Sequence, residues 1–237
     1  MKVLISGGSR GIGRALVEGF TKNGDSVAFI YKSSHDEARA LSGSTGAIAI
    51  CADVSNPTSV KIAAEEAISA LGGVDVLVNN AGISQIKLFT DITDDDWANM
   101  INTNLSSAFY LTRAVLPTMI SQKSGRIINI GSMWGKVSAS CEVHYSASKA
   151  GLRGLTLALA KEVGPSRITV NAIEPGVIAT EMNASLSPET IAELCEETPL
   201  CRIGTPSDVA NAVLFLASEK ASFITGQIIG VDGGFAI

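Results

Sequence analysis

The sequence has few aromatic residues, few charged residues and no basic excess, and each scarcity excludes a class of protein. Aromatic residues occupy 5% and charged residues 17% of the 237 positions, whereas 46% are hydrophobic. Intrinsically disordered chains show the opposite balance, because they cannot bury enough apolar surface to fold. The formal net charge is −5, so we expect no nucleic-acid partner, since such proteins present a basic surface to phosphates.

The sequence also lacks a long hydrophobic run. Its one long uncharged stretch, residues 97–112, contains three asparagines, whereas a membrane-spanning helix needs about 20 predominantly apolar residues. The apolar run after Met1 and Lys2 is too short for a signal peptide. We therefore expect a cytoplasmic protein that does not associate with a membrane.

Cysteine and histidine are scarce and poorly spaced for metal binding. The four cysteines, Cys51, Cys141, Cys195 and Cys201, form no CxxC pair, and the chain has two histidines. Structural zinc sites need closely spaced pairs of such ligands. We expect no metal site and four reduced thiols with a mainly structural role.

Short apolar segments alternate along the chain with segments of helical pattern. This repeated β-α-β order is typical of an α/β protein with one open parallel sheet and helices on both faces. We predict a Rossmann-type, doubly wound sheet of about seven strands within a single domain, residues 1–237, with a substrate lid at about residues 181–203. The predicted strands are 2–6, 26–31, 47–51, 74–79, 126–130, 168–173 and 227–231. The predicted helices are 11–23, 57–71, 94–122 in two pieces, 143–163 and 207–217.

A glycine-rich loop follows the first predicted strand and precedes the first helix. Glycine at these places permits positive φ and a close approach of the backbone to a pyrophosphate, and the helix N-terminus offers free N–H groups. A structural turn is the alternative interpretation of such a loop. The residues that we expect to contact a dinucleotide here are Gly7, Ser9, Arg10, Gly11, Ile12 and Gly13.

The end of the second predicted strand indicates which dinucleotide binds. An acidic residue at this place would bind the ribose hydroxyl of NAD, but the sequence reads Tyr31, Lys32, Ser33 and has no acid before Asp36. A cation and hydroxyl groups suit a 2′-phosphate instead, with Arg10 as a second cation. We predict NADP(H) rather than NAD(H); the alternative is that Lys32 is only solvated.

Tyr145 and Lys149 are the candidate catalytic pair. They lie four residues apart in a predicted helix and therefore on one face, and a neighbouring ammonium lowers the pKa of a tyrosine. Ser132 follows the fifth predicted strand, where its hydroxyl can polarise the same substrate oxygen that Tyr145 protonates. Asn104 lies within a predicted helix, where asparagine is unfavourable; it marks either a helix irregularity or a water-holding relay to Lys149.

With these residues in place, the chain resembles the short-chain dehydrogenase/reductase superfamily over essentially its whole length. Asn79 to Gly82 resembles the family's NNAG motif, and the tetrad Asn104, Ser132, Tyr145 and Lys149 resembles its catalytic residues. The resemblance implies that Tyr145 donates a proton to a ketone, that Lys149 also binds the nicotinamide ribose and that Asn104 holds a water. It also implies cofactor contacts for Asp53, Val54, Asn80, Ala81, Gly82, Pro175, Gly176, Val177, Ile178 and Thr180.

One position departs from the family pattern. Glu174 precedes Pro175 and Gly176, where many relatives have a small residue. Its charge either reaches solvent or alters the cofactor contacts.

Within the superfamily, the chain is most similar to bacterial 3-oxoacyl-[acyl-carrier-protein] reductases. The segment around Met133 and Trp134 is also similar to reductases of the 5-aminopentanone group on a lysine of elongation factor P. We expect Met133, Trp134, Glu142 and the catalytic Ser132 and Tyr145 to form the substrate site. Glu142 would attract the amine of such an aminoketone, or would instead cap the following helix and favour its dipole.

The partner and the assembly follow mainly from the resemblance. An acidic acyl-carrier protein would need a basic patch, for which Lys123, Arg126, Arg153 and Arg167 are the candidates. The resemblance implies a homotetramer. The segment 224–237 is nearly uncharged, so we expect it to be buried, either against another subunit or against its own sheet. Two alternatives remain open from the sequence: a cofactor-binding regulator without catalysis, and an NAD-dependent dehydrogenase.

Overall fold

The computed structural model describes residues 1–184 and 186–237 and contains a seven-stranded parallel sheet. The strand order is β3-β2-β1-β4-β5-β6-β7, so the direction of winding reverses between β1 and β4. Ligands of such sheets bind at this reversal, beyond the carboxyl ends of the strands. The strands are β1 (Lys2–Ser6), β2 (Ser26–Tyr31), β3 (Ile48–Cys51), β4 (Val76–Asn79), β5 (Gly125–Ile130), β6 (Ile168–Pro175) and β7 (Ile228–Val231).

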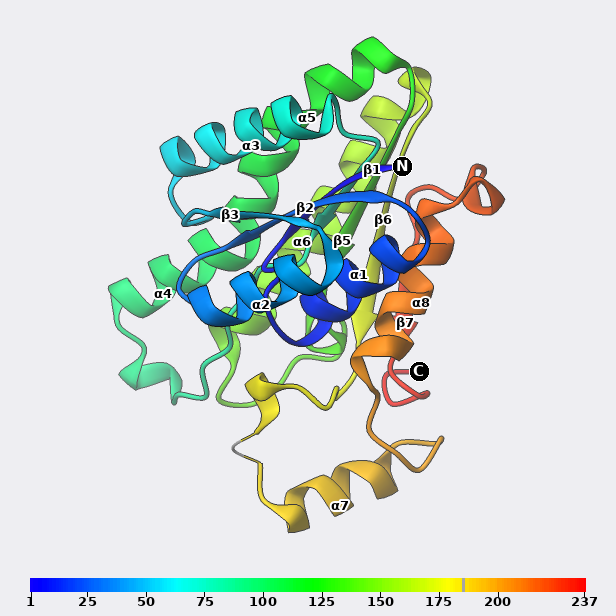
Figure 1. Cartoon of the computed structure of the whole chain (residues 1–237). Coiled ribbons are helices and arrows are strands. Elements are labelled where there is room, and N and C mark those ends of the chain that lie inside the picture. Colours follow the sequence, from blue (N-terminus) through cyan, green and yellow to red (C-terminus); the bar gives the residue numbers. More distant parts are fainter. Residues whose placement is uncertain (185) are drawn as a thin grey trace.

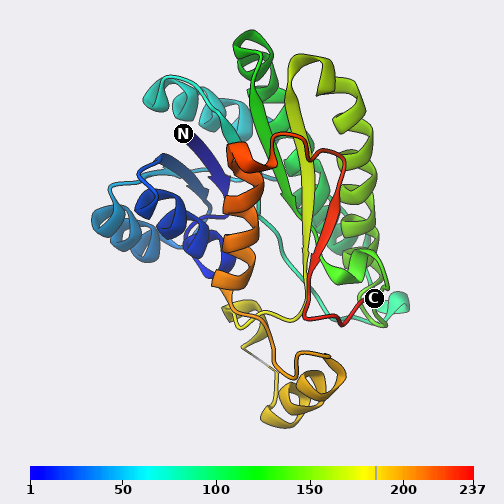
Figure 2. The same ribbon diagram turned by 90° about the vertical axis from the view of Figure 1, so that its right-hand side faces the viewer.

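Helices cover both faces of this sheet (Figures 1 and 2). Side chains of α1, α2 and α8 form one buried core with the sheet, and side chains of α3, α5 and α6 form the other. This arrangement confirms the doubly wound α/β prediction. The helices are α1 (Gly11–Lys22), α2 (His35–Thr45), α3 (Pro57–Leu71), α4 (Asp94–Ile101), α5 (Ser107–Gln122), α6 (Val143–Val163), α7 (Pro188–Glu197) and α8 (Pro206–Ala217).

The strands are apolar along their whole length because both of their faces are covered. In β1, Val3 and Ile5 belong to one core and Leu4 belongs to the other, since successive side chains of a strand point to opposite faces. All three are 0% exposed. Such strands read as continuous hydrophobic runs rather than as alternating patterns. None of the helices in the described ranges is long and apolar enough to cross a membrane.

A buried polar cluster joins the centre of the sheet to two helices. Asn79 of β4 donates from Nδ2 to Asn129 Oδ1 of β5 at 2.8 Å and to Thr112 Oγ1 of α5 at 3.1 Å. Asn129 in turn donates to Thr156 Oγ1 of α6 at 2.8 Å. Buried amides must find partners in this way, because an unpaired one costs about 1–3 kcal/mol. The cluster fixes α5 and α6 relative to the carboxyl ends of β4 and β5.

The predicted helical region 94–122 is interrupted as expected. A π-helical segment, η2 (Asn102–Ser106), separates α4 from α5 and contains Asn104. Such segments are rare and frequently occur at functional sites. Two other elements differ from the prediction: β6 continues to Pro175, and α2 was missed. The acidic residues Asp36 and Glu37 in the first turn of α2 and Gly46 at its end, in the left-handed conformation, were its sequence signals.

The packing of α1 against the sheet predicts a large loss of stability for one substitution. Phe20 is 0% exposed and belongs to the core shared with α8. We expect Phe20→Ala to lower the free energy of unfolding by about 3–5 kcal/mol, because it removes a buried ring and leaves a cavity. Phe89→Ala is the matched control, since Phe89 is 68% exposed, and it should change the value by at most about 0.5 kcal/mol. Denaturant unfolding of the two variants measures the difference; equal losses would contradict this description of the core.

Candidate active site

A cleft with a volume of about 670 Å³ runs along the carboxyl ends of the strands. Its lining contains every residue that the sequence assigns to cofactor or substrate, including the glycine loop, Trp134 and Glu142. Asn104, a member of the candidate catalytic tetrad, is not among the lining residues and lies behind the wall of the cleft. The structure adds lining residues that the sequence did not single out, among them Ser34, Ile83, Ser84, Asn99, Thr103 and Met182. Ser34, Ile83 and Ser84 follow the ends of β2 and β4, which was their available signal.

The glycine loop forms a concave floor in the cleft, and side chains at its glycine positions would fill that space. Gly7 and Gly11 have φ values of +66° and +51°, a region that disfavours other residues. A Cβ added to Gly13 would lie 1.9 Å from the carbonyl oxygen of Gly7. Arg10, which precedes α1, gives the helix no side-chain cap, so the first N–H groups stay available for an anion. These features fit the pyrophosphate of a dinucleotide.

The end of β2 brings together Lys32 and Asp53. Lys32 Nζ lies 2.7 Å from Asp53 Oδ2, and the Lys32 side chain is 64% exposed. Partial burial raises the pKa of Asp53, but hydrogen bonds from Lys32 and Ser55 outweigh that effect and lower it. Lys32 is therefore paired with Asp53, whereas the alternative interpretation leaves Lys32 only solvated. Arg10 is exposed at the edge of the same cleft.

Ser132, Tyr145 and Lys149 meet at the opposite end of the cleft. Ser132 follows β5 and accepts a hydrogen bond from the backbone N–H of Trp134 at 3.2 Å. Tyr145 and Lys149 lie on one face of α6, and Lys149 Nζ is 5.7 Å from the centre of the Tyr145 ring. Lys149 donates to the carbonyl oxygen of Ile130 at 2.9 Å. All three side chains are buried.

Burial controls the protonation of this pair. It raises the pKa of Tyr145 to about 12, an effect that the hydroxyl of Ser132 only partly offsets, and it lowers the pKa of Lys149 to about 8. The prediction that Lys149 lowers the pKa of Tyr145 therefore does not describe the net result in this structure. The reason is that loss of solvation disfavours both charged forms, phenolate and ammonium, and is the largest cause of both pKa shifts.

Asn104 holds the neighbouring loop in place. Its Oδ1 accepts the backbone N–H of Ile83 at 2.8 Å, and its Nδ2 donates to the carbonyl of Ile83 at 2.9 Å. A Cβ added to Gly82 would lie 3.4 Å from Asn104 Oδ1 and 3.5 Å from Lys149 Nζ. Asn104 thus lies in a helix irregularity, the π-helical segment η2, and also approaches Lys149.

Two acidic side chains, the partly buried Glu142 and the buried Glu174, each have a buried carboxylate oxygen without a hydrogen-bond partner in the described part of the chain. Glu142 precedes α6 but makes no side-chain capping bond, so the capping interpretation is wrong. Its Oε2 is buried without a hydrogen-bond partner in the described part of the chain, and burial raises its pKa. Glu174 is 4% exposed and pairs with Arg153, so the expectation that its charge reaches solvent is also wrong, because β6 continues through this position.

The predicted substrate wall lines the cleft, whereas the predicted basic patch does not. Met133 is buried, and the Trp134 ring lies 5.7 Å from the ring of Phe235 near the C-terminus. The patch does not form at the cleft. Lys123 and Arg167 precede β5 and β6, so they lie at the amino ends of these strands, about 20 Å from the cleft. Of the other two candidates, Arg126 pairs with Glu219 and Arg153 with Glu174.

Known proteins resemble this chain over almost its full length. Residues 7–236 match the family model described as enoyl-(acyl carrier protein) reductase. The chain is 40% identical over 236 residues to the 3-oxoacyl-[acyl-carrier-protein] reductase FabG of Staphylococcus aureus, covering 98% of this chain and 96% of that protein. It is 41% identical over 233 residues to the enzyme of the same name from Escherichia coli, with coverages of 98% and 95%.

A solved structure agrees with these relatives. A double mutant of a Serratia marcescens short-chain dehydrogenase/reductase superposes with a TM-score of 0.93 at 34% identity and covers 99% of this chain and 97% of its own. The glycine loop and the buried tyrosine–lysine pair line one cleft. The chain therefore belongs to the short-chain dehydrogenase/reductase family, whose members are oxidoreductases that use a nicotinamide cofactor.

Proposed function

We propose that this protein is an NADPH-dependent reductase that converts the ketone of a 3-oxoacyl thioester to a secondary alcohol. The observation that carries the proposal is the meeting of Ser132, Tyr145 and Lys149 in a cleft that the glycine loop also lines. The names of the Staphylococcus and Escherichia relatives support the thioester as substrate. A cofactor-binding regulator would have no use for the buried tyrosine–lysine pair.

Each buried side chain has a defined task in this proposal. A bound nicotinamide supplies a hydride. Tyr145 donates its phenolic proton to the ketone oxygen, and a pKa of about 12 keeps that proton in place until then. Ser132 donates a hydrogen bond that orients the same oxygen. Lys149 binds the nicotinamide ribose and, as a cation, stabilises the phenolate that forms. Asn104 holds a water on the path by which the proton is replaced.

The preference for NADPH rests on the end of β2. Lys32 and Arg10 are the cations that would bind the 2′-phosphate, with Ser33 as a hydroxyl donor. Lys32 is already oriented by Asp53, so a 2′-phosphate would share or replace this partner. The absence of a carboxylate at the end of β2 in the sequence argues against an NAD-dependent dehydrogenase.

The lid, the domain and the assembly complete the proposal. The chain acts as a single catalytic domain, residues 1–237, and the predicted lid at about residues 181–203 closes over the substrate. Helix α7, which belongs to this lid, projects from the body (Figure 2), and residue 185 of the lid lies outside the described residues. A homotetramer would cover the apolar side chains that α5 and α6 expose, such as Phe109, Ile120 and Leu157, each between 43% and 45% exposed, together with segment 224–237.

A second candidate function is favoured by Glu142. Its buried, unpartnered oxygen at the substrate end of the cleft suits a ligand with a positive charge, such as the aminopentanone group on a lysine of elongation factor P. The lid, residues 181–203, adds five acidic residues and one basic residue, Arg202, which pairs with Asp208 outside the lid. An acidic acyl-carrier protein would be repelled by such a surface, whereas an amine would be attracted.

The mechanism predicts a specific loss in Tyr145→Phe. We expect kcat with NADPH and an acetoacetyl thioester to fall about 10²- to 10⁴-fold, the usual contribution of a general acid, while NADPH binding stays unchanged. Absorbance of NADPH measures turnover, and fluorescence titration measures binding. Parallel assays with elongation factor P that carries the aminopentanone group separate the two candidate substrates. Full activity of Tyr145→Phe would refute the mechanism.

The cofactor preference predicts a selective effect of Lys32→Ala. We expect the Kd for NADPH to rise about tenfold, which corresponds to the loss of one partly exposed charge-assisted hydrogen bond. The Kd for NADH should stay within about twofold, because NADH has no 2′-phosphate. Lys61→Ala on α3, an exposed lysine outside the cleft, serves as the control. An equal loss for both cofactors would argue against the 2′-phosphate role of Lys32.

Glu142→Gln should stabilise the protein in a pH-dependent way. Burial raises the pKa of Glu142 in the folded protein, so ionisation costs stability as the pH rises through the unfolded and then the folded pKa. Thermal unfolding of Glu142→Gln should therefore occur at a higher temperature than that of the parent protein at neutral pH. At a pH below the ordinary carboxyl pKa, the unfolding temperatures of Glu142→Gln and the parent protein should coincide. Glu193→Gln, on the exposed face of the lid, controls for the change itself, and equal behaviour of both variants would contradict the prediction.

A further inference from the structure

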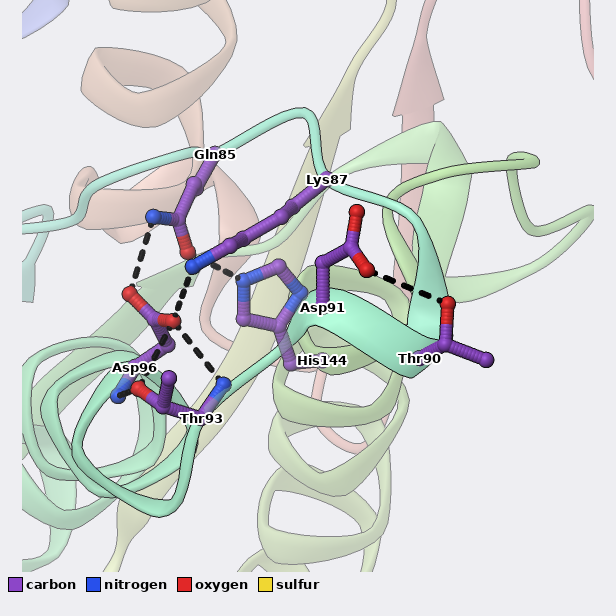
Figure 3. Close-up of polar contacts among 7 residues, drawn as sticks. All are labelled: Gln85, Lys87, Thr90, Asp91, Thr93, Asp96 and His144. Carbon is purple, nitrogen blue, oxygen red and sulfur yellow. Dashed lines mark hydrogen bonds and ion pairs between the residues drawn. The ribbon is translucent and has the colours of Figure 1, made fainter.

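The loop that leaves β4 forms one wall of the cleft and then turns toward α4 and α6. Its first part, residues 80–84, lines the cleft, where Asn104 holds Ile83. Its next part carries Gln85 and Lys87, whose side chains extend toward Asp96 of α4 and His144 of α6 (Figure 3). No step of the proposed reduction uses this second part of the loop.

Four side chains form a hydrogen-bonded chain from the surface to the core. Lys87 Nζ donates to Asp96 Oδ2 at 2.6 Å, and Gln85 Nε2 donates to Asp96 Oδ1 at 2.9 Å. Gln85 Oε1 lies 2.9 Å from Nε2 of His144. The side chains of Lys87 and Asp96 are 30% and 20% exposed, whereas His144 is 0% exposed.

This chain fixes the tautomer of His144. Hydrogen bonds from Lys87, Thr93 and Gln85 hold the pKa of Asp96 well below its usual range, and an ionised carboxylate only accepts. The amide nitrogen of Gln85 therefore faces Asp96, and its oxygen faces His144. It follows that His144 Nε2 carries the proton and donates it to Gln85. Nδ1 is then bare, and it is buried without a partner within residues 1–184 and 186–237.

The first turn of α6 depends on contacts from outside the helix. Glu142, which precedes it, supplies no side-chain cap, although helix starts leave N–H groups that need partners. The carbonyl of Cys141 accepts the backbone N–H of Lys87 at 2.8 Å, and His144 bonds to Gln85. Both contacts come from the loop after β4. This loop therefore holds the turn in which Tyr145 directly follows His144.

We propose that His144 is a positioning residue for Tyr145, acting through the Nε2–H that it donates to Gln85 at the inner end of the Lys87–Asp96–Gln85 chain. The inference rests on the proposed function, in which Tyr145 donates the proton. The Tyr145 hydroxyl must lie within hydrogen-bond reach of the substrate oxygen, and a misplacement of about 1 Å can cost about 100-fold in rate. Packing alone would require only an apolar side chain of similar volume.

The first test needs no turnover. The sequence has two histidines, and exposed His35 is the internal control for NMR of the full-length protein with labelled histidine nitrogens. We expect the buried imidazole to show a protonated Nε2 and a bare Nδ1. Burial lowers the pKa of His144, while the facing charges, Asp96 and Lys87, act in opposite directions. The neutral form should therefore persist below the pH at which an exposed histidine becomes charged. A proton on Nδ1, or charging together with His35, overturns the proposal.

The second test compares His144→Leu with His144→Gln, using NADPH and whichever ketone the parent protein reduces. We expect His144→Leu to lower kcat about 10- to 100-fold through misplacement of Tyr145, with the Kd for NADPH unchanged. His144→Gln keeps an N–H donor and should restore most of the lost kcat. Asp91→Asn is the matched control, because Asp91 lies in the same connection between β4 and α4 but bonds to Thr90 instead of the chain (Figure 3). The kcat of this variant should equal that of the parent.

Three outcomes decide against the inference or separate it from the proposed function. Equal losses in His144→Leu and His144→Gln, or an unchanged kcat in His144→Leu, would reduce His144 to a packing residue.

If His144→Leu does not fold, Lys87→Met at the partly exposed end of the hydrogen-bonded chain replaces it. We expect a smaller fall in kcat there, and an unchanged kcat overturns the proposal. If the parent reduces neither ketone, the proposed function fails, and the tautomer of His144 alone decides the inference.

Discussion

The parallel pairing of β1 with β4 is the contact on which the rest of the site depends. It brings the glycine loop against the loop after β4, where Asn80 Nδ2 donates to the carbonyls of Ser6 and Gly7 at 3.0 Å. Ser6 Oγ in turn accepts the backbone N–H groups of Asn80 and Ala81. These bonds satisfy backbone groups that would otherwise be unpaired at the reversal of winding. The two loops are therefore held against each other, and residues of both line the cleft.

Burial has two consequences at the other end of the cleft. It removes water from Tyr145 and Lys149, which disfavours both charged forms and keeps the proton on Tyr145. It also makes the position of α6 depend on specific polar contacts, since the helix has no capping side chain. Asn104 and His144 supply such contacts, one to each half of the loop after β4. The loop that lines the cleft is thus tied to the helix that carries Tyr145.

The acidic side chains near the substrate end are the feature that most separates the two candidate substrates. Glu142 is partly buried, its Oε2 has no hydrogen-bond partner among the described residues, and burial raises its pKa. A group of this kind reduces stability, as the cost of burying an incompletely paired carboxylate predicts. Natural sequences retain such costs mainly at functional sites. The basic residues that the sequence offered for an acidic carrier lie instead at the far edge of the sheet or are already paired.

The sequence by itself determined the alternation of strands and helices along the chain and the glycine loop, because local spacing and apolar runs dictate them. The assignment of Ser132, Tyr145 and Lys149 to catalysis rests on a resemblance and stays a prediction. Helix α2 was missed because its short, polar segment gives little apolar periodicity. Only the tertiary structure decided which charges are buried and what each one contacts. Glu174 looked exposed but is enclosed by the extension of β6, and His144 was unremarked until the loop after β4 placed Gln85 beside it. Burial and long-range pairing depend on residues far apart in the chain, so no local pattern can encode them.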